Sequence, residues 1–514
     1  KNLKWKKAGS AVLATALAGS MVLPATAYAQ GEIVQLEGGT STQTNTAPEQ
    51  VFLNKYSGTV RTQNFNDNWK FYLGDASGAQ TPAFDDSSWD QVNLPHDYSI
   101  DQKYNRSMDG ESGYLPGGTG WYRKSFTVDK SLEGKRISID FGGVYMNATI
   151  YVNGKKLGTH PYGYTPFSFD ITDNVKFGKE NVIAVKVDHQ TPSSRFYSGS
   201  GIYRDVDFVV TDTVHVDKNG TKIETPDLKE HVDGNNVAVK VKTTVVNESE
   251  RDASVKVKHT IYPKNGTAEQ AVATFESQEA VAVEKGKSKD VSADFTASGV
   301  QLWSTTTPNL YTVKTEVLMD GATVDTYETD YGFRYFAFDK NNGFTLNGQK
   351  MKLQGVCMHH DQGALGSVAN DRSTERQVEI LKMMGCNSIR VTHNPASDEL
   401  IDACNKHGIL VIDEAFDGWV APKNGNSNDY AKWFNKEIES DNEIMGAADN
   451  MTWAQFDLTA MIERGQNDPA IIMWSLGNEM WEGTGGYSAA YKTAQDNLVK
   501  WAQAADTTRP VTTG

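Results

Sequence analysis

A change in hydrophobic pattern after Gly332 limits most strongly how this 514-residue chain can fold. Downstream of this residue, short apolar runs alternate with longer stretches that have helical periodicity. The pattern predicts strands at 353–357, 387–392, 409–413, 470–476 and from 510, and helices at about 374–384, 397–407, up to 466, and 487–504. Regular alternation of strand and helix predicts a parallel sheet. Because no glycine-rich phosphate loop follows the first strand, we expect 332–514 to form the N-terminal half of a (β/α)8 barrel rather than a doubly wound sheet.

The two segments before Gly332 have the pattern of antiparallel β structure. Residues 51–213 contain short alternating runs divided by turn signals, and Asn153-Gly154 between two strand-like halves predicts a tight hairpin. Residues 214–331 continue the alternation, for example at Val237 and Val239. We therefore expect a jelly-roll β-sandwich at 51–213 and an immunoglobulin-like β-sandwich at 214–331.

The first thirty residues have the features of an export signal. Basic residues within 1–7 precede an apolar run at 8–23, and Ala27-Tyr28-Ala29 offers a small-residue cleavage site. The alternative, a membrane anchor, is disfavoured because the run is shorter than the roughly 20 residues that span a bilayer. We expect a signal peptide at 1–29, a flexible linker at 30–50, and a secreted or cell-surface protein.

Charge and cysteine content exclude several classes of protein. A net charge of −15 argues against nucleic acid, whose phosphates require a basic surface, and against a polybasic membrane contact. A neutral, hydroxyl-rich ligand is compatible with this charge. Cys357, Cys386 and Cys404 are odd in number and lie in apolar segments, where buried free thiols are common, so we expect no disulfide framework.

The ends of the predicted barrel strands carry the candidate chemistry, because catalytic groups of such barrels lie at the C-terminal strand ends. The residues there are His359, His360 and Asp361 after the first strand, Arg390, His393 and Asn394 at the second, Asp413 and Glu414 at the third, and Asn478 and Glu479 at the fourth. A carboxylic acid beside an amide suits glycosidic bond cleavage, in which the acid protonates the leaving oxygen and the amide binds a sugar hydroxyl. We expect Trp474, Met480 and Trp481 to form the apolar wall that such an acid needs.

Several motifs, in this order along the chain, resemble glycoside hydrolase family 2, the group of β-galactosidases, β-glucuronidases and β-mannosidases. The motifs are LPHDY at 94–98, GGTGWYR at 117–123, SRFYSGSGIYR at 194–204, QGVCMHHDQGALG at 354–366, IRVTHNP at 389–395 and SLGNE at 475–479. The resemblance covers essentially everything from residue 52 onward. It implies a sugar-binding sandwich, an immunoglobulin-like domain and a TIM barrel, in that order.

The resemblance also implies a retaining mechanism in which Glu479 is the acid/base. The nucleophile would be a second glutamate at the end of barrel strand seven, beyond residue 514, so we expect the 514-residue piece alone to be inactive and poorly soluble. Glu414 is implied as a supporting carboxylate.

The remaining site residues each have two interpretations. His359 and His393 fall at sugar-pocket positions of the family, although strand-end histidines can also be held by backbone alone. Arg390 either orients the nucleophile or only pairs with Glu414. Arg195 stands where some relatives present an aspartate, and it either reaches the pocket from the first domain or forms a structural salt bridge.

We expect no cofactor and no metal site. Adjacent His359 and His360 point to opposite faces of a strand, which argues against zinc. Some members of the family bind magnesium through Glu and His shortly after the third strand, whereas this chain has Asp417-Gly418-Trp419 there without that pair, which gives no support for a required magnesium.

The sequence therefore predicts an exported exo-acting β-galactosidase that acts on β-galactoside oligosaccharides or glycans. A β-glucuronidase or β-mannosidase of the same family is one alternative. The alternative from another class is a non-catalytic carbohydrate-binding surface protein.

Overall fold

The computed structural model describes residues 52–53, 60–480 and 488–514. Residues Gln50–Gly514 belong to one compact unit. The predicted signal peptide at 1–29, the predicted linker at 30–50 and Trp481 lie outside the described residues. Within the described ranges, no helix combines the length and the apolar character needed to cross a membrane.

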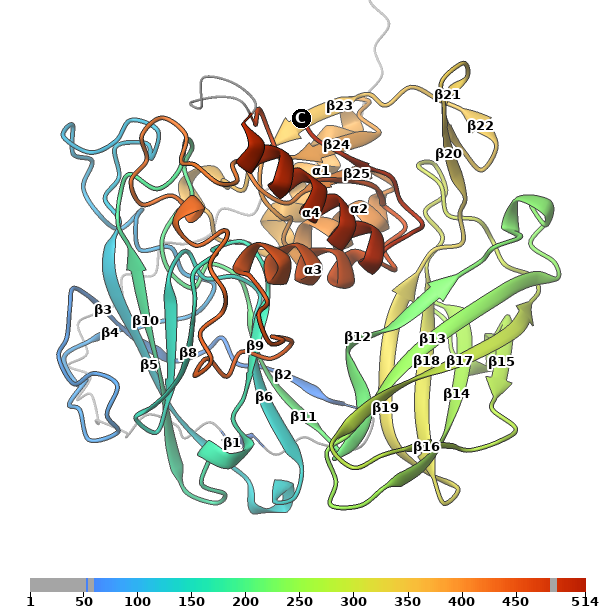
Figure 1. Ribbon diagram of the computed structural model, residues 1–514, viewed down its shortest axis with the longest axis horizontal. Helices are drawn as coiled ribbons and strands as arrows, with labels where there is room; N and C mark the ends of the chain where they lie inside the picture. Colours follow the sequence, from blue (N-terminus) through green and yellow to red (C-terminus); the bar gives the residue numbers. More distant parts are fainter. Residues whose placement is uncertain (1–51, 54–59, 481–487) are drawn as a thin grey trace, which may run out of the picture. The chain divides into compact units, whose positions relative to one another are not determined.

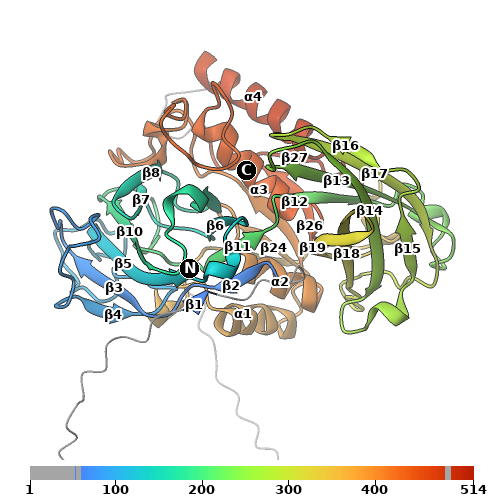
Figure 2. The same cartoon turned by 90° about the horizontal axis from the view of Figure 1, so that it is seen from below.

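The first part of the chain forms two sheets that pack face to face, which we call the first sandwich. One sheet has the order β4-β3-β5-β10-β7-β8 with β1 beside β5, and Figure 2 shows it as a row; the other has the order β2-β11-β6-β9. Its strands are β1 (Phe52–Leu53), β2 (Thr62–Asn64), β3 (Trp69–Leu73), β4 (Asp90–Val92), β5 (Gly118–Val128), β6 (Arg136–Phe141), β7 (Ala148–Val152), β8 (Lys155–His160), β9 (Phe167–Asp170), β10 (Glu180–His189) and β11 (Val206–Thr211). The two sheets meet through aromatic side chains such as Phe126 and Phe208, whose ring centroids lie 6.3 Å apart.

The predicted hairpin is confirmed. Strands β7 and β8 are antiparallel neighbours joined at Asn153-Gly154. Both turn residues have positive φ, 50° at Asn153 and 87° at Gly154. This is the conformation of the two-residue turns that match the twist of paired strands, and asparagine and glycine adopt it with little strain.

The second sandwich follows directly and is antiparallel throughout. Its sheets have the orders β12-β13-β17 and β15-β14-β18-β19, with β16 paired to β14. Its strands are β12 (Val214–Glu224), β13 (Val237–Asn247), β14 (Ala253–Pro263), β15 (Ala273–Glu276), β16 (Val281–Val283), β17 (Lys287–Ala297), β18 (Tyr311–Met319) and β19 (Ala322–Tyr331). The alternating valines Val237, Val239 and Val241 are buried, as the period of two requires.

The last part, which we call the barrel segment, contains the predicted parallel sheet. After a small sheet of β20 (Phe336–Asp339), β21 (Gly343–Leu346) and β22 (Gln349–Lys350), five parallel strands run in the order β23-β24-β25-β26-β27. They are β23 (Gly355–Met358), β24 (Ser388–Val391), β25 (Leu410–Glu414), β26 (Ile471–Ser475) and β27 (Val511–Thr512). The helices between them are α1 (Asp371–Met383), α2 (Asp398–His407), α3 (Trp453–Gly465) and α4 (Ala489–Ala505), which gather against the sheet in Figure 1.

Local signals explain why these helices begin and end where they do. The hydroxyl of Ser397 accepts a hydrogen bond from the amide of Leu400 and caps the start of α2. Gly408 ends the same helix with φ 69°, a left-handed conformation that glycine adopts without a Cβ clash. The predicted strands and helices of the barrel segment are confirmed to within a few residues at each end.

The three cysteines differ in exposure. All three are free, but Cys357 on β23 is exposed and Cys386 is half-buried; only Cys404 is buried. Cys357 lies on β23, which pairs with β24 on one side and with no other described strand.

Buried polar contacts attach the first sandwich to the barrel segment. Asp457 of α3 accepts hydrogen bonds from His160 Nε2 at 2.8 Å, from Thr165 Oγ1 at 2.5 Å and from the hydroxyl of Tyr430. Arg204 of the sandwich reaches the barrel and donates to the carbonyl of Pro395 at 2.8 Å. These partners satisfy groups that would be costly to bury alone, so they fix the sandwich against the strand ends.

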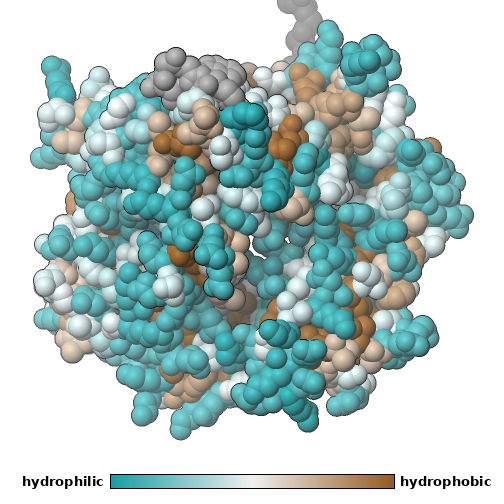
Figure 3. Space-filling model, in the orientation of Figure 1, coloured by the Kyte–Doolittle hydropathy of each residue, from teal (hydrophilic) through white to brown (hydrophobic). Residues whose placement is uncertain are grey.

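The surface of the molecule is mainly polar on the face drawn in Figure 3. Hydrophilic side chains cover most of this face, and hydrophobic ones form small separate patches. Such scattered apolar exposure is normal and marks no docking surface by itself.

A buried histidine of the second sandwich predicts a pH-dependent stability. Burial lowers the pKa of His259 to about 4. Because an unfolded histidine titrates near 6.5, this ring stabilises the fold fully above that pH, and the contribution is lost as pH falls towards 4, at about 1.4 kcal/mol per pH unit. His259→Phe, which suits the stack with Phe275 and Phe295, should flatten the pH dependence of the unfolding free energy between pH 6.5 and 4.5.

The measurement is urea unfolding at several pH values, followed by circular dichroism. Thr315→Val serves as the control, because it removes the 3.1 Å hydrogen bond to His259 but keeps the titrating ring. Equal pH slopes in wild type and His259→Phe would contradict the prediction.

Candidate active site

The parallel strands bring the predicted polar residues to one edge of the sheet. Arg390 lies in β24, Glu414 ends β25, and Ser475 ends β26. The residue pairs along these strands are in parallel register, for example Arg390 beside Ile412 and Glu414 beside Ser475. Residues that follow the strands, such as Asn478, therefore meet at the same edge.

Glu414 is the centre of this group. Its carboxylate accepts hydrogen bonds from Arg390 Nη2 at 2.7 Å, Arg390 Nε at 3.1 Å, His393 Nδ1 at 2.6 Å and Ser475 Oγ at 2.6 Å. The side chain is 0% exposed. A buried carboxylate is tolerated only when donors surround it, and here each oxygen has at least one. Glu414 thus ties the ends of three neighbouring strands together.

Asn478 links this centre to Glu479. Its Oδ1 accepts from Arg390 Nη2 at 3.1 Å, and its Nδ2 lies 3.1 Å from Asp417 Oδ1 and 3.4 Å from Glu479 Oε2. The Glu479 side chain is 52% exposed, in contrast to Glu414. Glu479 also has φ 44°, a conformation that a side chain disfavours and that is often held at functional sites.

Arg195 reaches the strand ends from the first sandwich. It donates to Asp417 Oδ1 at 2.7 Å and Oδ2 at 3.0 Å, and its Nη1 and Nη2 each lie 3.4 Å from Glu479 Oε2. Arg195 therefore forms a salt bridge with Asp417 and also contacts Glu479. Burial would raise the pKa of Asp417, but Arg195 and Lys423 outweigh it and lower that pKa.

The two histidines after β23 point in different directions. The His359 ring packs against Phe196 at 4.4 Å and against His393 at 5.3 Å, which places it at the same edge as Glu414. The His360 ring instead lies 5.0 Å from Tyr164 of the first sandwich. Burial, with His393 as a second cause, lowers the pKa of His359, so its ring is neutral near pH 7 and can accept or donate one hydrogen bond.

Some residues of this group do not stand out in the sequence. Lys423 donates to the carbonyl of Asn478 at 2.5 Å and to Asp417 at 3.2 Å, and it comes from a long loop without periodicity. Phe196 comes from the sandwich. Phe196 lies within the motif at 194–204 without standing out as a site residue, and nothing in the sequence around Lys423 marks it.

The predicted apolar wall is partly wrong. Trp474 is fully buried, but its indole donates to Asp506 at 2.9 Å and its ring lies next to Gly465 of α3. It therefore points to the helix layer and not towards Glu479. Met480 is buried, and its sulfur packs against Gly477.

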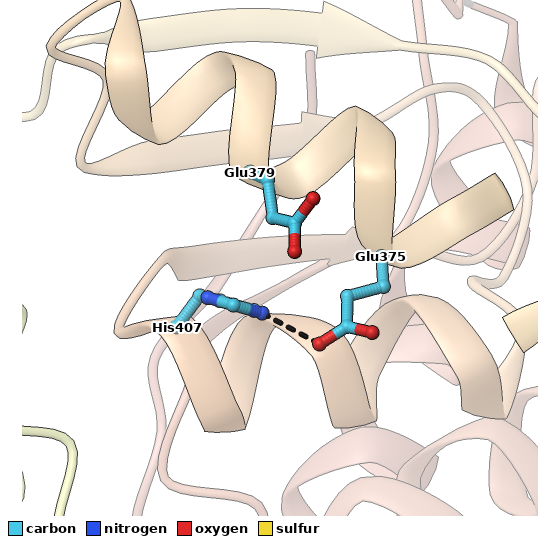
Figure 4. Close-up of side chains that lie close together, drawn as sticks. All are labelled: Glu375, Glu379 and His407. Carbon is cyan, nitrogen blue, oxygen red and sulfur yellow. Dashed lines mark hydrogen bonds and ion pairs between the residues drawn. The ribbon is translucent and has the colours of Figure 1, made fainter. Parts of the chain in front are cut away.

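One cluster has the composition of a metal site. Glu375 and Glu379 of α1 and His407 of α2 each place a ligand atom within 4.8 Å of the others (Figure 4). Lys406 Nζ already lies 2.6 Å from Glu375, His407 Nε2 lies 2.8 Å from it, and Arg372 Nη2 lies 2.8 Å from Glu379. Because Lys406 neutralises Glu375 and Arg372 neutralises Glu379, the cluster acts as an ion-pair cross-link between α1 and α2.

Three consecutive parts of the chain match one family. The sequence matches "Glycosyl hydrolases family 2, sugar binding domain" over residues 62–212, "Glycosyl hydrolases family 2" over 221–334 and "Glycosyl hydrolases family 2, TIM barrel domain" over 339–514. The chain belongs to glycosyl hydrolases family 2. The resemblance seen in the sequence motifs and the predicted fold class are thereby confirmed.

Individual relatives agree with this assignment. The chain is 42% identical over 421 residues to a β-galactosidase of Bacteroides ovatus. The matched region covers 81% of this chain and 46% of the relative. A solved family 2 structure from Bacteroides cellulosilyticus matches with a TM-score of 0.78 and 38% identity, over 88% of this chain and 57% of that one. The solved structure of a β-glucuronidase of Bacteroides uniformis matches with a TM-score of 0.73 and 29% identity, over 88% of this chain and 52% of that chain. The chain spans about half the length of the curated relatives it matches.

The Glu414 contacts predict a large effect of a small substitution. Glu414→Gln keeps the shape of the side chain but removes the charge that compensates Arg390, and its amide cannot accept from all four donors. We expect a loss of about 2–4 kcal/mol in stability, because Arg390 loses its counter-charge and the buried side chain at 414 can no longer satisfy the donors around it.

Denaturant unfolding measures the free energy of unfolding of Glu414→Gln, with the exposed Glu437→Gln as the matched control. An effect no larger than that of the control would show that the strand ends do not depend on Glu414.

Proposed function

We propose that the protein containing this chain is a retaining glycoside hydrolase that releases terminal β-linked galactose, with Glu479 as its acid/base. The observation that carries the proposal is the position of Glu479. It is an accessible carboxylate at the C-terminal edge of the parallel sheet, between Asn478 and Arg195. Barrel enzymes build their active sites at this edge.

In the proposed first step, a nucleophilic carboxylate attacks the anomeric carbon. The bond from that carbon to the leaving oxygen breaks, and Glu479 gives its proton to this oxygen. In the second step, the Glu479 carboxylate takes a proton from water, the water oxygen bonds to the anomeric carbon, and the nucleophile leaves.

The nucleophile is proposed to be a glutamate beyond residue 514. Three carboxylates lie at or just after the end of β25, and none suits the role. Asp413 accepts from Arg464 and the amide of Ala396, Glu414 is enclosed by four donors, and Asp417 is engaged by Arg195, Lys423 and Asn478. The β-glucuronidase of Bacteroides uniformis has been solved covalently bound to a cyclophellitol-type aziridine, which supports a covalent mechanism for this family.

The other predicted residues have proposed roles as follows. His359, His393 and Asn478 bind sugar hydroxyls, Arg390 fixes Asn478 as well as Glu414, and Arg195 bounds the sugar site from the first sandwich. We also propose that turnover needs no magnesium, because Arg195 and Lys423 already supply positive charge to Asp417. Export to the cell surface or beyond remains proposed from the N-terminal sequence.

Galactose is proposed over glucuronic acid on the basis of the relative from Bacteroides ovatus. The cations nearest to Glu479 do not argue for a charged sugar, because Asp417 engages both Arg195 and Lys423. A mannoside-cleaving enzyme and a non-catalytic sugar-binding protein are the remaining alternatives.

The acid/base role predicts a dependence on the leaving group. In the full-length enzyme, Glu479→Gln should lower kcat/KM by about 10²–10⁴-fold for β-galactosides with alkyl or sugar leaving groups, which need protonation. Dinitrophenyl β-galactoside leaves without a proton and should lose far less in the glycosylation step.

Steady-state kinetics on both substrate types provide the test, with the exposed Glu133→Gln as the control. Equal losses for the two substrate types would remove Glu479 from the acid role.

The sugar assignment has its own test. We expect the full-length enzyme to hydrolyse nitrophenyl β-galactoside at least about 100-fold faster than the glucuronide or mannoside, a discrimination that differential hydrogen bonding to one sugar can supply. A preference for the glucuronide or the mannoside would replace the galactose assignment. No turnover of any of the three, with glycan binding retained, would support the non-catalytic alternative.

A further inference from the structure

Arg195 lies between two carboxylates that differ in exposure. Its Nη2 lies 2.7 Å from Asp417 Oδ1 and its Nε lies 3.0 Å from Asp417 Oδ2, whereas Nη1 and Nη2 each lie 3.4 Å from Glu479 Oε2. The Asp417 side chain is 12% exposed, and that of Glu479 is 52% exposed. The guanidinium group therefore makes two short contacts with the enclosed carboxylate, in the bidentate geometry that is strongest for this pair, and longer contacts with the accessible one.

Charged and titratable groups approach Glu479 from every described element at this edge of the sheet. They are Arg195 from the first sandwich, His359 after β23, Arg390 in β24, His393 after it, Glu414 at the end of β25, and Asp417 and Lys423 in the loop that follows. Glu414 balances the charge of Arg390 at 2.7 Å. His359 is neutral near pH 7, because burial lowers its pKa. The cation that lies within hydrogen-bond distance of the Glu479 carboxylate in the described part of the chain is Arg195.

Such a cation conflicts with the task of an acid. A group that protonates a leaving oxygen must carry its proton in the resting enzyme. A positive charge beside a carboxyl group stabilises the ionised form and drives that proton off. Lys423 adds a second positive charge nearby, since its Nζ donates to the carbonyl of Asn478 at 2.5 Å, directly before Glu479 in the chain. Some negative charge at this place has to offset the two cations.

Asp417 supplies that negative charge. Burial would raise the pKa of Asp417, but hydrogen bonds and attraction from Arg195 and Lys423 outweigh it and lower that pKa. The carboxylate is therefore ionised at neutral pH. It contacts both cations, Arg195 at 2.7 Å and Lys423 at 3.2 Å, and it also accepts from Asn478 Nδ2 at 3.1 Å.

We propose that Asp417 is a positioning residue for the acid, which binds Arg195 and so leaves Glu479 able to carry a proton in the resting enzyme. In this role Asp417 acts through Arg195 and exchanges no proton with the substrate. The cation remains useful, because it bounds the sugar site while its charge is largely taken up by Asp417. The inference rests on the proposed function, in which Glu479 protonates the leaving oxygen.

The pH dependence of kcat/KM for the full-length enzyme tests this role, because it reports the ionisations of the free enzyme. The substrate is an alkyl β-galactoside, which needs the acid, so activity falls on the basic side as Glu479 loses its proton. In Asp417→Asn, this basic limb should move to lower pH by about one unit, the size of effect that a close charge has on a carboxyl group. The exposed Asp441→Asn should leave the limb in place. A merely structural role of Asp417 would lower kcat/KM without moving the limb.

Arg195→Gln provides the second half of a double-mutant cycle. Without the guanidinium group, the proton on Glu479 is held more tightly, so the basic limb should move to higher pH. Adding Asp417→Asn to Arg195→Gln should then move the limb by less than half as much as in the wild-type background, because the two residues act through one interaction.

An unmoved basic limb in Asp417→Asn would overturn the inference, and so would equal shifts in the two backgrounds. If Asp417→Asn fails to fold, Arg195→Gln decides alone, and a limb that stays or moves to lower pH counts against the inference. Failure of the proposed function looks different. Dinitrophenyl β-galactoside leaves without a proton, so in the wild type it should lack this limb. The same basic limb for both substrates would remove Glu479 from the acid role and this inference with it.

Discussion

The geometry of the strand ends depends on the burial of one carboxylate, Glu414. A charge removed from water must be compensated by donors in good geometry, or it is costly. Arg390, His393 and Ser475 supply those donors from β24, the turn after it, and β26. The same arginine then holds Asn478. A requirement for electrostatic compensation thus becomes a fixed arrangement of the residues that surround Glu479.

The first sandwich supplies a structural part of this site. Arg195 contacts Asp417 and Glu479, and Phe196 packs on His359. Behind this surface, Arg204 donates to the carbonyls of Pro395 and Ala396, close to His393 in the chain. His160 and Thr165 of the first sandwich donate to the buried Asp457 of α3 and hold the sandwich against the barrel segment. The sandwich therefore bounds the site and supports the turn that follows β24.

The sequence predicts much of this arrangement because two features can be read from it, the alternation of strands and helices and the topology of a barrel. Alternation of strand and helix locates the strand ends, and barrel topology brings the ends together, so Arg390, His393, Glu414 and Glu479 could be grouped without coordinates. Lys423 could not, since it comes from a long loop where no period relates it to the strands. The packing of Phe196 on His359 could not either, because it joins the first sandwich to the barrel segment. The pairing of Asp417 with Arg195 likewise depends on contacts across the two parts.

The error at Trp474 has a physical reason that the sequence itself contains. Side chains alternate faces along a strand. Ser475 turns towards Glu414, so its neighbour Trp474 must turn away, to Asp506 and the helix layer. Hydrophobicity alone suggested a wall beside Glu479, whereas strand geometry excludes it at that position.

The environments of Glu414 and Glu479 divide their roles. Both belong to the same edge of the sheet, yet Glu414 is enclosed by donors from its own fold, whereas Glu479 is half exposed on a left-handed backbone. A group that exchanges protons with a substrate must be accessible, and of these two carboxylates only that of Glu479 is exposed. Differences in surroundings, not in side-chain chemistry, therefore separate the enclosed Glu414 from Glu479, the proposed acid/base. The Asn478 amide is the element that couples them, because it touches Arg390 on the Glu414 side and Glu479 on the other.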